Sequence, residues 1–200
     1  MAVTRRPTGS LPAQGFTMIE LMVVVVVMAV LLTVAVPSFE AVMNSNRLAG
    51  ASNELMASLQ AARMEAMKRN ARVALCLSAT AKTNAPTCSA AGTTDGWLVF
   101  ADANKNGAYN AAGDTLLRTS TIAPAVLVKS SAAPAGVVVF RSDGFARTAA
   151  GALLNGTIDL CIPTRRPPQN VRHVIVGAGS RVSIASVDGA AKCLTPADKP

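Results

Sequence analysis

Residues 16–36 form the most distinctive pattern in the chain, because nearly every position is apolar and Glu20 carries the only charge. About 20 consecutive apolar residues are needed to cross the hydrocarbon core of a bilayer as a helix. The segment therefore predicts a membrane-spanning helix, and Pro37 follows where the apolar run ends. A carboxylate in lipid costs about 2.5–3.5 kcal/mol. Glu20 is thus expected to find a positive partner, or alternatively to reach the polar interface.

Short, polar and basic residues precede this apolar segment. Residues 1–15 include Arg5 and Arg6, and they end in Gly15. In an ordinary secretory signal the apolar region comes before the cleavage site and is removed with the signal. Here the order is reversed, so cleavage after Gly15 would leave the apolar helix on the mature protein. Residues 1–15 are therefore predicted to be a leader peptide of a different class.

After Pro37 the helical pattern continues but becomes amphipathic. Apolar and small residues recur at intervals of three and four, which places them on one helix face. They are Leu48, Ser52, Leu55, Leu59, Ala62 and Ala66. This pattern predicts an amphipathic helix over residues 37–72, with one face packed on a globular head.

From Val73 onward, short β-type runs alternate with clusters of Gly, Pro, Asn and Asp that are typical of turns. The expected strands are Val73–Leu77, Trp97–Phe100, Val126–Lys129, Val137–Phe140, Thr157–Ile162, Arg172–Val176 and Arg181–Ser186. One long helix followed only by strands indicates an α+β fold, with the helix packed on an antiparallel sheet. The β-rich head is assigned to residues 73–194, with an exposed loop at 163–170 and a frayed tail at 195–200.

Four cysteines lie outside the apolar segment, and none forms a C-x-x-C pair typical of zinc sites: Cys76, Cys88, Cys161 and Cys193. In an exported chain an even number of cysteines predicts disulfides. Three connectivities are allowed, and the pairs Cys76–Cys88 and Cys161–Cys193 are favoured because each brackets a loop-rich stretch. Four reduced, buried thiols are the alternative.

The N-terminal motif carries a family resemblance. Residues 15–20 read Gly-Phe-Thr-Met-Ile-Glu, which resembles the signature of type IV prepilins and type II secretion pseudopilins, with Met18 in place of the usual leucine. The resemblance implies cleavage after Gly15 by prepilin peptidase and N-methylation of Phe16. It also implies that Glu20 pairs with the N-terminal amine of a neighbouring subunit in the filament, and that Pro37 bends the helix.

Parts of the head are similar to the GspH/FimT group of minor pilins and pseudopilins, namely Gly96–Phe100, Asp102–Gly107 and Asp114–Arg118. This resemblance implies a structural subunit, not an enzyme, without a cofactor. It would be anchored in the inner membrane by one helix, with its head in the periplasm, and would assemble with other pilins. Three roles remain open: a tip-associated minor pilin that initiates type IV pilus assembly, a GspH-like pseudopilin that promotes type II protein export, or a FimT-like receptor for double-stranded DNA.

The chain has a net charge of +8, and cations near its C-terminus are candidates for binding DNA. Sequence-independent DNA binding needs cations clustered on one surface. The candidates are Arg165, Arg166, Arg172, Arg181 and Lys192. In the FimT-type pattern a glycine precedes two arginines separated by one residue, and residues 179–183 keep only one of these arginines. Aromatic side chains that would stack on single-stranded bases are missing from this region. Solvated surface charge is the alternative interpretation.

A second candidate site resembles the start of a calcium loop. Asp102, Asn104 and Asn106 supply oxygens at alternate positions, and Gly107 occupies the sixth position, as in an EF-hand. The twelfth position is Gly113, which has no ligand, and Asn-Gly is a strong turn signal. A turn is favoured over a metal site. His173 lies in a strand-like run without a nucleophile motif, so no catalytic residue is predicted.

Overall fold

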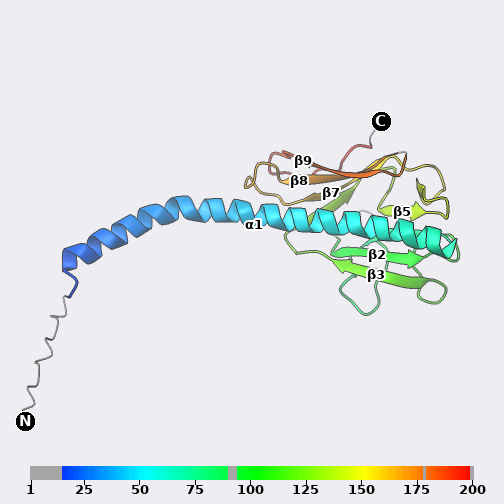
Figure 1. Cartoon of the computed structure of the whole chain (residues 1–200), viewed down its shortest axis with the longest axis horizontal. Coiled ribbons are helices and arrows are strands. Elements are labelled where there is room, and N and C mark those ends of the chain that lie inside the picture. The colour runs from blue at the N-terminus through cyan, green and yellow to red at the C-terminus, as the bar shows by residue number, and fades with distance from the viewer. Residues whose placement is uncertain (1–14, 90–93, 178, 199–200) are drawn as a thin grey trace, which may run out of the picture. The chain divides into compact units, whose positions relative to one another are not determined.

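The computed structural model describes residues 15–89, 94–177 and 179–198. The chain forms two compact units, Met1–Phe39 and Glu40–Pro200, which are described separately. Helix α1 (Met18–Arg69) contributes residues to both of them (Figure 1). The predicted leader lies outside the described residues except for Gly15.

Local hydrogen bonds explain where α1 begins and ends. The Thr17 hydroxyl accepts the backbone N–H of Glu20 at 3.2 Å, which is an N-cap interaction. At the other end Asn70 adopts a φ of 49°, and Ala71 donates its N–H to the carbonyl of Ala66 at 3.1 Å. A left-handed residue with such a bond is typical of helix C-termini. The helix is therefore slightly shorter at both ends than the sequence predicts.

The described part of the second unit holds nine strands in two antiparallel sheets. The first sheet has the order β3-β2-β1-β5-β6, with β1 (Val73–Ser78), β2 (Gly96–Ala101), β3 (Thr115–Thr121), β5 (Val137–Phe140) and β6 (Ala146–Arg147). The second has the order β4-β7-β8-β9, with β4 (Leu127–Ser130), β7 (Gly156–Cys161), β8 (Val171–Val176) and β9 (Val182–Val187). All seven expected strands are present within one or two residues, whereas β3 and β6 were not expected.

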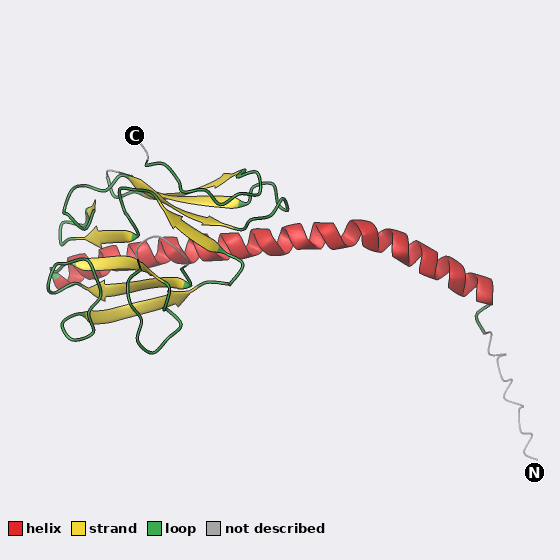
Figure 2. Cartoon of the chain, turned by 180° about the vertical axis from the view of Figure 1, so that it is seen from behind, coloured by secondary structure: helices red, strands yellow, loops and turns green. Residues whose placement is uncertain are grey.

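Residues 40–69 of α1 lie between the two sheets (Figures 1 and 2). The six positions of the predicted helix face, from Leu48 to Ala66, are all buried. All of them except Ser52 share one apolar cluster with inward-facing side chains of both sheets, including Trp97, Phe140 and Leu160. The indole N–H of Trp97 donates to the buried Ser58 hydroxyl at 2.9 Å, so a polar contact also fixes the helix on β2. The α+β fold with a helix packed on antiparallel sheets is confirmed.

Two disulfides join the cysteines in the favoured pairs, Cys76–Cys88 with an S–S distance of 2.05 Å and Cys161–Cys193 with 2.07 Å. The second disulfide ties the C-terminal segment to the end of β7. This segment is held again at Asp198, whose carboxylate accepts the backbone N–H of Ala133 at 2.9 Å. One contact therefore holds the tail at Asp198, while the expected fraying from residue 195 stays a prediction and residues 199–200 lie outside the described part.

Candidate functional site

The N-terminal part of α1 presents an apolar surface that this chain does not cover. Every large apolar side chain that the structure describes from Leu21 to Leu32 is 52–64% exposed. The helix is long and apolar enough to span a membrane, and none of its most apolar stretch is buried within the chain. A contiguous apolar surface of this kind marks a membrane or protein interaction site. The first part of α1 is therefore the principal candidate site of the molecule.

Glu20 lies in the first turn of α1, inside this apolar surface. Its backbone N–H is bonded to Thr17, but its carboxylate forms no ion pair with the residues the structure describes. Phe16, one turn away, is 82% exposed. A positive partner for Glu20 would thus come from another molecule. The pairing with a neighbour's amine and the modification of Gly15 and Phe16 stay predictions.

Pro37 lies inside α1 rather than at its end. Proline has no backbone N–H, so the carbonyl of Thr33 lacks its usual helical donor at this position. The boundary between the two compact units follows directly, between Phe39 and Glu40. The predicted bend at Pro37 stays a prediction.

The five DNA-binding candidates do not form one cluster. Arg165 and Arg166 belong to the loop between β7 and β8, and Lys192 follows β9 near the same end of the second sheet. The carbonyl of Lys192 accepts a long hydrogen bond from Asn170 of that loop, at 3.5 Å. Arg181 lies in the turn between β8 and β9, at the opposite end of β8. Six strand residues separate the two ends by about 20 Å.

Arg172 is not available to a polyanion. It is 8% exposed, and its guanidinium donates to the carbonyls of Gln169 at 2.9 Å and Val171 at 3.3 Å. Burial lowers the pKa of this guanidinium. The side chain shares a sheet face with Val174, which belongs to the apolar core. The expectation that Arg172 binds DNA is therefore wrong, and its position on the inner face of the sheet is the reason.

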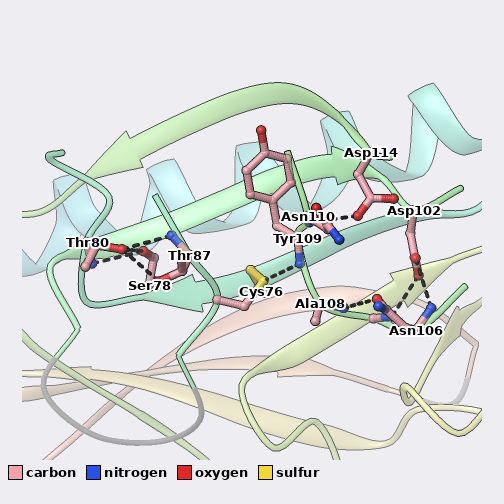
Figure 3. Close-up of a disulfide and its surroundings, with 12 residues drawn as sticks. Cys76, Ser78, Thr80, Thr87, Asp102, Asn106, Ala108, Tyr109, Asn110 and Asp114 are labelled. Carbon is pink, nitrogen blue, oxygen red and sulfur yellow. Dashed lines mark hydrogen bonds between the residues drawn. A yellow bond between two sulfur atoms is a disulfide. The ribbon is translucent and has the colours of Figure 1, made fainter. Parts of the chain in front are cut away.

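The calcium-like run between β2 and β3 is a self-satisfied turn (Figure 3). The carboxylate of Asp102 accepts the N–H groups of Asn106 and Gly107 at 3.1 and 3.0 Å, and Arg72 Nε lies 2.7 Å from it. The side-chain oxygens of Asn104 and Asn106 also accept backbone N–H groups within the turn. These oxygens are thus used by the protein itself. Among the described residues no cluster of three or more His, Cys, Asp or Glu side chains fits a metal ion.

The stability of this turn is expected to be independent of calcium. Calcium or a chelator should leave the melting temperature of the protein unchanged, because backbone donors already occupy the loop oxygens. Asp102→Asn should instead lower the free energy of unfolding by about 3 kcal/mol, since it leaves Arg72 without its buried partner. Chemical denaturation of both proteins measures this, with Asn104→Ala as the matched change at an exposed position. A calcium-dependent rise in the melting temperature of the unmodified protein would contradict the turn.

His173 pairs across the strands with Asp159, and the imidazole Nδ1 is hydrogen-bonded to the carboxylate. Asp159 is 3% exposed, and burial raises the pKa of its carboxyl, although the hydrogen bond and charge of His173 act in the opposite direction. The sequence predicted an ordinary sheet position for His173 and missed this pair, because the register of β7 and β8 is needed to find it. A pocket of about 150 Å³ adjoins the pair beneath the C-terminal segment.

The unburied apolar helix and the two-sheet head define a pilin-like subunit anchored through its N-terminus. The prokaryotic N-terminal methylation motif matches residues 12–36. The family model described as type II transport protein GspH matches residues 51–180, so the chain belongs to the GspH family. It is therefore a minor pilin or pseudopilin, a family of structural proteins that are processed by prepilin peptidase and assemble with other pilins.

Two solved proteins are similar in structure. The type IV minor pilin FimU of Pseudomonas aeruginosa is 19% identical, with a TM-score of 0.45 over 70% of this chain and 90% of FimU. The minor pseudopilin EpsH from the type 2 secretion system of Vibrio cholerae is 9% identical, with a TM-score of 0.47 over 70% of this chain and 97% of EpsH. No curated protein matches the sequence.

Proposed function

We propose that the chain is a low-abundance structural subunit that initiates assembly of a type IV pilus and stays at or near its tip. The observation that carries this proposal is the exposed apolar part of α1 with Glu20 as its single charge. This surface suits lipid before assembly and a bundle of similar helices afterwards. Anchoring through one helix in the inner membrane, with the head in the periplasm, is part of the same proposal.

The head suits a structural role because it is rigidly built around α1. Both sheets pack on residues 40–69, and polar contacts add to the apolar core. The Glu54 carboxylate accepts bonds from Arg118 at 2.7 Å and Ser120 at 2.8 Å, which ties the helix to the edge strand β3. The Asn44 amide donates to the Arg166 carbonyl at 2.9 Å, near the β7–β8 loop. Movement of this part of the helix would therefore carry the head with it.

A GspH-like role in type II secretion is the second candidate. The description of the family model that matches residues 51–180 names type II transport, which favours this role. In type II secretion, the subunit would belong to a pseudopilus that promotes protein export. Both roles use the same helix in the same way. The arrangement of the cations does not favour binding of double-stranded DNA, because Arg172 is buried and Arg181 lies apart from the other candidate cations.

A deletion strain separates the two roles. We expect loss of the gene to reduce the number of surface pili, with normal activity of secreted enzymes in the medium, because a missing initiator prevents filament growth. Pili are counted by electron microscopy while exoprotein activity is assayed in the same cultures. Re-expression of the unmodified chain serves as the control. Lost secretion with normal pili would contradict the pilus role and assign the chain to the pseudopilus.

A further inference from the structure

We propose that the head binds a phosphate group in a basic pocket at the C-terminal end of α1, formed by Arg72, Lys105 and Arg141. The pocket has a volume of about 370 Å³. It is lined by Asn70, Ala71, Arg72, Lys105, Arg141 and Ser142. Three segments far apart in the sequence meet here: the end of the helix, the loop between β2 and β3, and the residues after β5. Such a pocket could serve a subunit of either kind of filament.

The turn that resembles a calcium loop presents a cation to this pocket instead of binding one. Hydrogen bonds from Asn106 to Asp102 and Asn104 close the backbone around Lys105, which adopts a φ of 63°. The carboxylate of Asp102 is buried against Arg72. The acidic oxygens of the loop thus face inward, and the Lys105 side chain is exposed.

The two arginines come from neighbouring strands, since Arg72 directly precedes β1 and β5 pairs with β1. Arg72 donates from Nη2 to the carbonyl of Ala149 at 3.2 Å, so its guanidinium is held in place from both ends. Arg141 directly follows β5 and is exposed. Its Nη2 lies only 3.0 Å from the position that a Cβ would occupy at Gly151, where φ is +97°. A glycine at this position therefore leaves room for the Arg141 head group.

The charges around the pocket are not balanced. Asp102 compensates Arg72, but neither Lys105 nor Arg141 forms an ion pair with a described residue. The acid nearest to Arg141 along the chain, Asp143, gives its carboxylate to Arg147 at 2.8 Å. Asp143 also interacts electrostatically with Arg141, but Lys105 and Arg141 both lack an ion pair, and no acidic side chain is among the residues that line the pocket.

The surrounding surface adds to this positive potential. Lys68 and Arg69, in the last turn of α1, share the single carboxylate of Glu65. Arg63 donates to the carbonyl of Ser180, which brings Arg181 to the same end of the head. A concentration of one charge sign raises the local concentration of counter-ions and speeds their association.

A phosphate group fits these features better than a carboxylate does. Its two negative charges match the two cations that lack an ion pair, and guanidinium groups bind phosphate oxygens through paired hydrogen bonds. The Ser142 hydroxyl supplies a further donor at the pocket wall. The group can belong to a free ion or to a lipid headgroup, because both present the same chemistry to the pocket.

The test is titration of pyrophosphate into the mature, full-length protein in neutral detergent, followed by calorimetry. The pocket variant carries Lys105→Asn and Arg141→Gln; asparagine is chosen because it tolerates the positive φ at position 105. The matched control carries Arg165→Gln and Lys192→Gln, which remove the same charge at the other end of the head. We expect affinity to fall at least tenfold in the pocket variant and less than twofold in the control. Arg141→Gln alone should give an intermediate loss.

A second titration, with water-soluble short-chain phosphatidic acid, distinguishes the source of the phosphate. If either compound binds saturably and loses affinity only in the pocket variant, the pocket is supported, and the compound that binds identifies a free ion or a headgroup as the source. If neither compound binds, or if both double variants lose affinity equally, the pocket is overturned and only diffuse surface charge remains. Equal melting temperatures of the three proteins ensure that the loss is not caused by unfolding.

Discussion

Replacement of Gly15 by leucine is expected to leave the leader attached and to keep the protein in the membrane fraction, outside any filament. Cleavage after Gly15 is what would create a free amine on Phe16 next to the apolar helix. A leucine at position 15 would place a bulky side chain directly beside the peptide bond that the peptidase must cleave. The fold should not change, because among the described residues no heavy atom beyond the chain neighbours of Gly15 lies within 4 Å of the position that a Cβ would take there. The expected effect is therefore a block of processing rather than a loss of structure.

Gly50→Leu provides the matched control for this experiment. Gly50 lies within α1 and Gly15 precedes it, but a Cβ at Gly50 also has no neighbour within 4 Å. This variant should be shortened and assembled normally, and the loss of a mid-helix glycine should slightly favour the helix. Processing is measured by immunoblotting and by mass spectrometry of the N-terminal peptide. Normal shortening of the Gly15 variant would overturn the leader prediction.

The helix face and the disulfides could be predicted because local spacing determines them. A side chain three or four positions along a helix returns to the same face, so the run from Leu48 to Ala66 identified the buried face before any partner was known. In the structure, this helix face packs against both sheets of the head. The cysteine pairs followed from a similar local argument, since Cys76–Cys88 and Cys161–Cys193 each close a loop-rich stretch.

Features that depend on strand pairing could not be predicted in this way. Strand β3 lies at the edge of its sheet, where only β2 pairs with it. It is exposed along most of its length and has polar side chains, so its sequence lacks the apolar pattern of a buried strand. Arg172 looked like a surface cation, but alternation along β8 places it on the inner face with Val174. The basic pocket is another such feature. It needs β1, β2 and β5 to bring Arg72, Lys105 and Arg141 to one end of the sheet.

Glu20→Ala is expected to preserve membrane insertion but to reduce incorporation into filaments by about a hundredfold. Alanine removes a charge that costs about 2.5–3.5 kcal/mol in lipid, so insertion should become easier. In a bundle of helices, however, the carboxylate would face the N-terminal amine of a neighbour. Removal of one member of a buried ion pair costs about 3–5 kcal/mol, because the other charge is left alone. A loss of about 3 kcal/mol corresponds to more than a hundredfold in an equilibrium constant.

Two further variants separate this pairing from other roles of the carboxylate. Glu20→Gln keeps the size and polarity of the side chain but not its charge, so it should fail as Glu20→Ala does. Glu40→Ala removes an acid that is half exposed and lies 3.8 Å from Arg166 within the head, where an ion pair contributes at most about 1 kcal/mol. It should therefore assemble normally. Immunoblots of sheared surface filaments, compared with total membrane protein, measure incorporation. If Glu20 only reached the polar interface of the membrane, all three variants would assemble like the unmodified chain, and its role in assembly would have to be abandoned.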